Sequence, residues 1–159
     1  MILVLLGTQN NSFHRLLEEV QKNIENQNIK EEVIVQKGYT RFESENMTLY
    51  TQLPADELQQ LIEKADLVIT HGGVGSIISA IRRGKKVIAI PRLKKYGEHV
   101  NDHQYDIIKS FDDSGYIIGL SCVEELGAAL QKVTDFEPKQ YVNNTGNILK
   151  IVEDFISNN

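Results

Sequence analysis

The run LVITHGGVGS, residues 67–76, joins the apolar pattern of a buried β-strand to a glycine-rich turn, and residues 77–82 continue with the pattern of a helix. Such a turn leaves backbone N–H groups free at the helix N-terminus, where they bind anions, most often phosphates. The three glycines of the turn allow a tight bend and a close approach by a ligand. The hydroxyl of Ser76 and the imidazole of His71 can each donate a hydrogen bond to a phosphate oxygen.

A plain structural turn is the alternative explanation of these glycines, because Gly-Gly turns between a strand and a helix are common in α/β proteins. Two standard nucleotide motifs are absent from the chain: it has no G-x-x-x-x-G-K-[ST] loop, and the glycine spacing is not G-x-G-x-x-G. A nucleotide that binds here must therefore be held by another pattern.

The composition predicts one globular domain over residues 1–159. Hydrophobic residues make up 41% of the chain and charged residues 25%, and the net charge of −5 argues against general nucleic-acid binding. The single cysteine, Cys122, excludes an internal disulfide and a cysteine-cluster zinc site, and it fits a reducing cytoplasm. The apolar run 1–6 ends at Gly7 and lacks a basic start, so it predicts a first strand rather than a signal peptide or a membrane span.

Apolar strand patterns alternate with helical patterns along the chain. This alternation predicts a doubly wound, mainly parallel, Rossmann-like sheet with helices on both faces. Strands are expected at residues 2–6, 32–36, 47–50, 67–70, 86–90 and 116–119. Helices are expected from a Ser12 cap to about 27, from Pro54 to 65, from 77, at 99–111, at 122–133 and at 138–157.

Three loops should converge at the carboxyl edge of this sheet, where ligands of such folds bind: residues 7–11, 71–76 and 92–104. Gly7, Thr8 and Gln9 follow a strand and form a second candidate anion site, although a plain turn explains them equally well. The third loop carries side chains that can bind sugar hydroxyls, although a solvated loop explains it as well; they are Glu98, Asn101, Asp102 and Gln104. Its Lys94 and Lys95 are either solvated or contacts for a phosphorylated acceptor or for anionic lipid headgroups.

A metal site is a minor alternative in this region. His99 and His103 are four residues apart on an expected helix, which suits a metal pair, but an exposed helix face explains them equally well. The chain contains no D-x-D motif, so we expect no obligatory metal and no other cofactor.

The combination of His71-Gly72-Gly73-Val74-Gly75-Ser76, Pro91 and Asn101-Asp102-His103-Gln104 resembles the donor-binding, C-terminal half of GT-B glycosyltransferases, in particular the family 28 C-terminal domain. It is similar to the small subunits of two-component bacterial capsular and exopolysaccharide glycosyltransferases. It also resembles the soluble subunit of the eukaryotic dolichol-linked N-acetylglucosaminyltransferase. The resemblance covers nearly the whole chain.

The resemblance implies roles for individual residues. It assigns Gly7, Thr8 and Gln9 to the first donor loop, and His71, Gly72, Gly73, Gly75 and Ser76 to a cradle for the donor diphosphate. It assigns Asp102 and Gln104, with Glu98 and Asn101 nearby, to the sugar hydroxyls, and it places Leu53 and Pro54 beside the uracil ring. Relatives often carry an acidic residue for the ribose on the helix after the cradle, where this chain has Ser79.

The implied function is inverting transfer of a hexose, with galactose favoured, from a UDP-sugar to a polyprenyl-diphosphate-linked saccharide in capsular or exopolysaccharide synthesis. A GT-B enzyme has two such domains, so the resemblance implies a membrane-associated, acceptor-binding partner subunit at the inner face of the plasma membrane. The general base is expected to be Glu98 or His99, or a residue of the partner. The alternatives are a non-catalytic UDP-sugar-binding accessory or sensor subunit and a structural module that binds no UDP; a UDP-sugar 2-epimerase would need two such domains.

Overall fold

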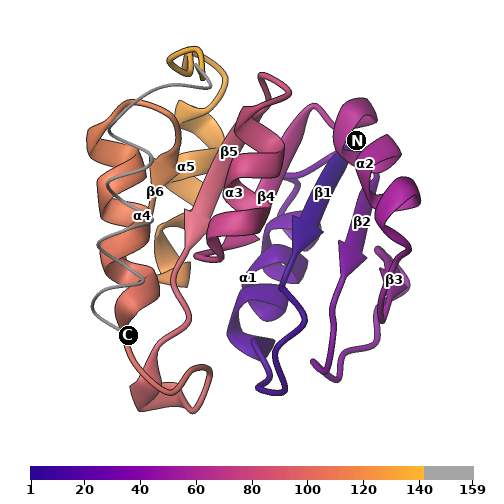
Figure 1. Ribbon diagram of the computed structural model, residues 1–159. Coiled ribbons are helices and arrows are strands. Elements are labelled where there is room, and N and C mark those ends of the chain that lie inside the picture. Colours follow the sequence, from indigo (N-terminus) through magenta and orange to yellow (C-terminus); the bar gives the residue numbers. More distant parts are fainter. Residues whose placement is uncertain (142–159) are drawn as a thin grey trace.

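A six-stranded sheet forms the centre of the structure, a computed structural model that describes residues 1–141 (Figure 1). The strands follow the order β3-β2-β1-β4-β5-β6, and all five pairings are parallel. This confirms the doubly wound α/β fold expected from the sequence. Their bounds are β1 Ile2–Leu5, β2 Val33–Gln36, β3 Thr48–Tyr50, β4 Leu67–His71, β5 Lys86–Ile90 and β6 Ile118–Gly119.

The central strands are mostly apolar because helices cover both faces of the sheet. Every residue of β1 and β4 is buried, whereas the edge strand β3 exposes Thr48 and Tyr50. Helices α1 (His14–Glu25) and α5 (Leu126–Lys132) cover one face. Helices α2 (Ala55–Lys64), α3 (Val74–Ile81) and α4 (His103–Asp113) cover the other (Figure 1).

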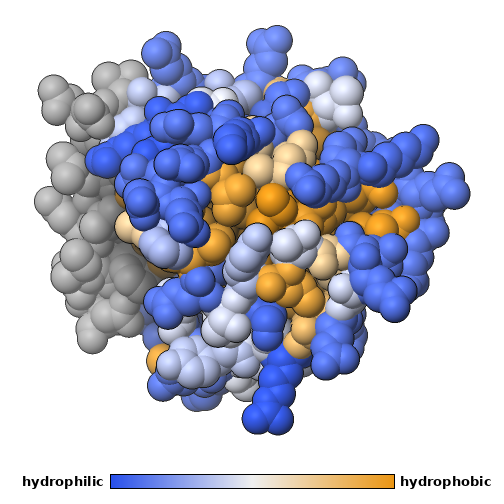
Figure 2. Space-filling model, turned by 90° about the vertical axis from the view of Figure 1, so that its right-hand side faces the viewer, coloured by the Kyte–Doolittle hydropathy of each residue, from blue (hydrophilic) through white to orange (hydrophobic). Residues whose placement is uncertain are grey.

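Two hydrophobic cores result, one on each face. The first is centred on Leu16, Leu17 and Val20 of α1, and the second on Ile77, Ala80 and Ile81 of α3 together with residues of α2 and α4. Figure 2 views the molecule from the side of β3 and α2 and shows apolar surface framed by hydrophilic side chains. Leu49 of β3 and Leu58 and Leu61 of α2 are among the partly buried hydrophobic residues that complete the two cores.

Several element ends differ from the sequence prediction. Helix α1 begins at His14 rather than at Ser12, because the N–H of Phe13 donates to the hydroxyl of Thr40 at 2.9 Å and no local side chain caps the helix. Helix α4 begins at His103, after a short 3₁₀ helix, η1 (Lys94–Tyr96), and a second one, η2 (Val123–Glu125), precedes α5. Of the helix expected at 138–157, residues 138–141 are not helical and the remainder lies outside the described residues.

The strand order reverses between β1 and β4. From β1 the chain passes to α1 on one face, and from β4 it passes to α3 on the other, so the two loops diverge and leave a crevice at the carboxyl ends. This is the position where the loops at 7–11 and 71–76 were expected to meet. None of the helices in residues 1–141 is long and apolar enough to cross a lipid bilayer.

Candidate functional site

A pocket of about 440 Å³ occupies the crevice between β1 and β4. Seven of the residues predicted from the sequence line it: Gly7, Thr8, Gln9, His71, Gly73, Gly75 and Ser76. Leu5, Gln36, Leu58, Ile62 and Ser79 complete the lining. The fold therefore brings the first loop and the glycine-rich turn together around one cavity.

The N-terminus of α3 opens into this pocket. Its N-cap is Gly73, no side chain caps it, and its first turn contains no acidic residue. The first N–H groups of a helix have no intrahelical acceptor and carry the positive end of the helix dipole. A Cβ added at Gly75 would meet no atom of the described residues within 4 Å, so these residues leave the space beside the N–H groups open. This end of α3 has the geometry and the field of an anion site.

His71, the last residue of β4, forms a wall of the pocket and is only 5% exposed. Burial, reinforced by the positive charge of Arg92, lowers the pKa of its imidazole to about 3, so the ring is neutral at physiological pH. The ring edge packs closely against two glycines. A Cβ on Gly73 would lie 2.4 Å from its Cε1, and a Cβ on Gly7 would lie 2.7 Å from its Nε2. Gly7 also has a φ of +78°, a left-handed conformation that favours glycine.

Arg92 holds the loops in place behind the pocket. The residue is 1% exposed, and its guanidinium donates hydrogen bonds to the carbonyl oxygens of Leu6, Asn11 (2.7 Å) and Glu98 (3.1 Å). These bonds tie the first loop to the third. Burial lowers the pKa of Arg92 to about 10, which leaves the side chain cationic at neutral pH, so a fixed positive charge stands near the anion site.

Glu98 does not face the pocket, in contrast to the catalytic role expected of it. Its carboxylate is 3% exposed and accepts hydrogen bonds from Nε and Nη2 of Arg15 at 2.7 and 2.8 Å. It also accepts one from the backbone N–H of Leu93 at 3.1 Å. A base must reach the proton it takes. The buried ion pair gives Glu98 a structural role: it fixes the third loop onto α1.

The sugar-binding residues expected in the third loop are also occupied internally. Asn101 accepts the N–H of His103 at 3.0 Å, and Asp102, which is exposed, accepts the N–H of Lys94 at 2.8 Å. Gln104 is 3% exposed and binds Gly72, Arg92 and His71. None of the three lines the pocket.

Gly72 makes no contact with the pocket either, because its backbone packs against Gln104. A Cβ at this position would lie 2.6 Å from the Cβ of Gln104. The lack of a side chain at Gly72 therefore allows α4 to pack closely against the turn, and it does not open space for a ligand.

His99 borders the pocket through Gln9, since the His99 Nε2 and Gln9 Nε2 atoms lie 3.0 Å apart. Burial, followed by the charge of Arg92, lowers its pKa, which favours the neutral imidazole. His99 precedes α4, so the helical spacing with His103 that suggested a metal pair is absent. The residues 1–141 contain no cluster of three or more His, Cys, Asp or Glu side chains arranged to hold a metal ion.

Gln36 is a pocket residue that sequence reasoning missed. It ends β2, is buried, and accepts the N–H of Leu53 at 3.1 Å through Oε1, while its amide nitrogen makes no hydrogen bond within the described residues. It lines both the crevice and an adjoining pocket of about 610 Å³ that also contains Leu53 and Pro54. The available signal was a polar residue at the carboxyl end of an apolar strand.

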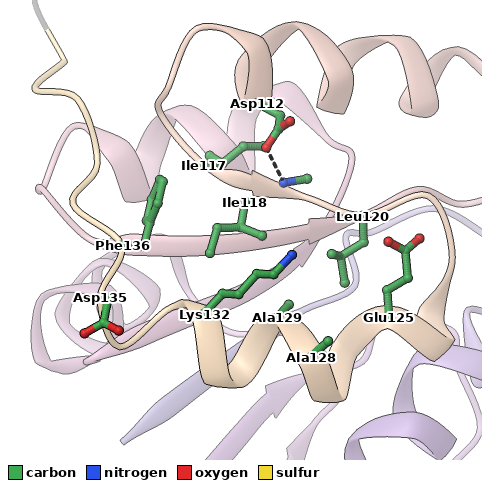
Figure 3. A pocket seen from close by; sticks show the side chains of 11 residues that line it. Asp112, Ile117, Ile118, Leu120, Glu125, Ala128, Ala129, Lys132, Asp135 and Phe136 are labelled. Carbon is green, nitrogen blue, oxygen red and sulfur yellow. Dashed lines mark hydrogen bonds between the residues drawn. The ribbon is translucent and has the colours of Figure 1, made fainter.

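A further pocket lies at the opposite edge of the sheet and contains none of the predicted site residues. It has a volume of about 630 Å³ and lies between β6 and α5 (Figure 3). Ile118, Leu120 and Ala129 contribute apolar surface to it. The carboxylate of Asp112 accepts a hydrogen bond from the N–H of Gly119 at 3.0 Å (Figure 3). The crevice between β1 and β4 is therefore the better candidate for chemistry.

Known proteins resemble this chain in sequence. UDP-N-acetylglucosamine transferase subunit ALG13 of Homo sapiens is 32% identical over 81 residues, which cover 51% of this chain and 7% of that protein. The subunit of the same name from Candida albicans is 29% identical over 111 residues, 70% of this chain and 32% of that protein. The matched segments thus span less than a third of the length of either relative.

Solved structures share the fold. A solution structure of ALG13 superposes with a TM-score of 0.61 at 18% identity and covers 95% of this chain and 93% of that chain. The crystal structure of MurG from Acinetobacter baumannii gives 0.57 at 17% identity, with 82% of this chain and 40% of that chain covered. A family model, the glycosyltransferase family 28 C-terminal domain, matches residues 1–158. The chain belongs to this glycosyltransferase family.

Proposed function

We propose that this domain binds a UDP-sugar, with the diphosphate at the N-terminus of α3, and supplies the donor half of a glycosyltransferase. The observation that carries the proposal is the uncapped helix end at Gly73, which opens beside the buried, neutral His71 in the crevice where the strand order reverses. Backbone N–H groups and one imidazole N–H can together hold a diphosphate without any metal ion.

The nucleoside would extend from the crevice toward β3. The adjoining pocket shares Thr8, Gln36 and Leu58 with the crevice and adds Leu53 and Pro54, whose apolar surfaces suit a uracil ring. The free amide nitrogen of Gln36 can donate to a uracil carbonyl or a ribose hydroxyl. Ser79 lines the crevice at the position where relatives carry an acid, so ribose binding here would rest on uncharged groups.

The transferred sugar is proposed to be N-acetylglucosamine. The curated relatives are named as subunits of a UDP-N-acetylglucosamine transferase. The galactose and the capsular or exopolysaccharide setting expected from the sequence have no support among them.

In the proposed reaction an acceptor hydroxyl attacks the anomeric carbon, the bond from that carbon to the diphosphate oxygen breaks, and UDP leaves with the electron pair. The N–H groups of α3 and of His71 stabilise the negative charge that develops on the leaving diphosphate. The acceptor proton passes to a general base. Among residues 1–141, those that line the crevice carry no carboxylate, and Glu98 is engaged by Arg15. The base is therefore assigned to His99 or to the partner.

A membrane-associated partner subunit would bind the lipid-linked saccharide acceptor and close the open side of the crevice. One α/β unit offers half of the cleft that a GT-B transferase uses, and the curated relatives are named as subunits. The domain would then work at the cytoplasmic face of a membrane through this partner. The lack of a carboxylate among the described residues of the crevice also fits the second candidate function, a UDP-sugar-binding accessory subunit without turnover.

Calorimetric titration with UDP and with a panel of UDP-sugars tests the proposal. We expect UDP to bind, His71→Ala to weaken it, and the exposed His14→Ala control to leave it unchanged. Absence of UDP binding by the folded domain, both alone and with its co-expressed partner, would refute the proposed function. Binding without transfer in the presence of the partner would favour the accessory subunit.

A further inference from the structure

The amide of Gln104 has only one orientation that its neighbours allow. Its Oε1 lies 3.0 Å from the backbone nitrogen of Gly72 and 3.0 Å from that of Arg92. Both partners are donors, and only the carbonyl oxygen of an amide side chain accepts. The oxygen of Gln104 must therefore point toward these two N–H groups, and its NH₂ group must point the other way, toward His71.

This orientation fixes the proton on the imidazole of His71. The Gln104 Nε2 lies 3.2 Å from Nδ1 of His71, and since Nε2 can only donate, Nδ1 must accept. A neutral imidazole carries one proton, which is therefore on Nε2. The hydrogen-bond network thus determines a tautomer that the heavy-atom positions of the imidazole alone do not reveal.

The proton on Nε2 faces the crevice. The imidazole is packed against Gly7 and Gly73, and a Cβ at either glycine would lie 2.7 Å from Nε2. No residue among 1–141 forms a hydrogen bond with Nε2, although the side chain is almost completely buried. A donor without an acceptor among residues 1–141, on a side chain that lines a pocket beside an open helix N-terminus, is arranged to meet an anionic ligand.

We propose that Gln104 is a positioning residue that locks His71 as the Nε2–H tautomer, so that the donor diphosphate always meets a hydrogen-bond donor at this wall. The inference rests on the proposed function for the identity of the ligand, but not for the tautomer. The other tautomer would direct the lone pair of Nε2 at a phosphate oxygen, which is repulsive. Gln104 therefore acts on the ligand through His71, in place of the direct contact with sugar hydroxyls that its sequence position suggested.

A neutral donor has a physical advantage here. The charged groups that face His71 are Arg92 on the β5–α4 loop and, when protonated, His99 on the same loop, and both disfavour an imidazolium. The positive field is already supplied by Arg92 and by α3, so His71 contributes direction rather than charge. Its hydrogen bond should then be independent of pH over the physiological range.

Gln104→Glu is the variant that tests the lock, because it preserves the shape of the side chain. One carboxylate oxygen can still accept from Gly72 and Arg92, but the other can only accept, so it should pull the imidazole proton to Nδ1. Nitrogen-15 NMR of the free domain reads both ring nitrogens of His71 directly. We expect a protonated Nε2 and a bare Nδ1 in the wild type, and a protonated Nδ1 in Gln104→Glu.

UDP titrations between pH 6 and 8 supply the functional readout. Wild-type affinity should not change with pH through His71. Gln104→Glu should bind at least about tenfold more weakly at pH 8, and should recover toward pH 6 because the nearby carboxylate stabilises an imidazolium that regains the Nε2 proton. Gln131→Glu on the exposed side of α5 introduces the same charge far from the crevice and should behave as the wild type.

A wild-type spectrum with the proton on Nδ1 would overturn the inference, even if the variant fails to fold. Retention of the Nε2 proton in a folded Gln104→Glu domain would overturn it as well, as would an unchanged UDP affinity at pH 8. If the wild-type tautomer is as expected but UDP does not bind, the proposed function fails while the lock stands, so the two failures are distinguishable.

Discussion

Gly75→Ala should separate ligand binding from folding in the crevice. Gly75 is the second residue of α3, and a Cβ built there meets no atom of residues 1–141 within 4 Å. Its φ is not among the positive values found elsewhere in the chain. Alanine is a better helix former than glycine by up to about 1 kcal/mol, so the substitution should leave the free energy of unfolding unchanged or raise it slightly.

The same methyl group would occupy the space in which the diphosphate is proposed to lie. A ligand held away from the α3 N-terminus loses at least one hydrogen bond between a backbone N–H and a charged oxygen, worth about 1.5–3 kcal/mol. Because each 1.4 kcal/mol corresponds to a factor of ten, UDP affinity should fall roughly 10- to 150-fold.

Urea unfolding and calorimetric titration of the same preparations supply the two measurements. Gly127→Ala is a matched control at the start of α5, where the added Cβ would lie 3.2 Å from Oδ1 of Asn23 and far from the crevice. It should leave UDP affinity unchanged. Wild-type UDP affinity in Gly75→Ala would refute the placement of the diphosphate at the N-terminus of α3, whatever its effect on stability.

Three further predictions concern the groups around the crevice. Gly73→Ala should displace the His71 ring, because the new Cβ would lie 2.4 Å from Cε1. We expect the free energy of unfolding in urea to fall by about 1–3 kcal/mol and UDP to bind more weakly. An unchanged free energy of unfolding would contradict the packing described. The pKa of His71 is about 3 in the folded state and near 6.5 in the unfolded chain, so only the unfolded chain takes up this proton as the pH falls below 6.5. The free energy of unfolding should therefore drop by about 1.4 kcal/mol between pH 7.5 and 5.5 through this group. His71→Asn should flatten that part of the plot of unfolding free energy against pH. Arg15→Met should lower the free energy of unfolding in urea by about 3 kcal/mol, because it leaves the Glu98 carboxylate buried without its cation. Adding Glu98→Gln should restore part of that free energy. Additive losses in the double variant would show that the two residues are not coupled.

The fold was predictable because its signals are local and repeated. Buried parallel strands appear as uninterrupted apolar runs, and β1, β4 and β5 lie within one residue of the expected bounds. The element ends that differed depend on contacts distant in sequence. The Thr40 hydroxyl replaces a local cap at the start of α1, and no pattern around Ser12 could reveal a partner 27 residues away from Phe13.

The half of the site built from backbone was also predictable. Glycines between a strand and a helix indicate a tight turn or a close approach to the backbone. The structure places Gly7, Gly73 and Gly75 around one cavity. Their side-chain-free surfaces serve two distinct ends, however. Gly75 borders open space within the described residues, whereas Gly73 and Gly7 leave room for His71, a difference that only the positions of neighbouring atoms reveal.

The third loop shows why polar motifs are ambiguous in a sequence. A loop that turns sharply at a sheet edge has its own backbone donors and cations to satisfy before it can bind anything. Glu98 balances Arg15, and Gln104 satisfies two backbone N–H groups. A motif residue of this kind can be essential for donor binding without touching the donor, because removing it would release the group that does. The positions most informative about the ligand are therefore those whose polar atoms lack a partner among residues 1–141, and in this crevice they include His71 Nε2, the amide nitrogen of Gln36 and the first N–H groups of α3.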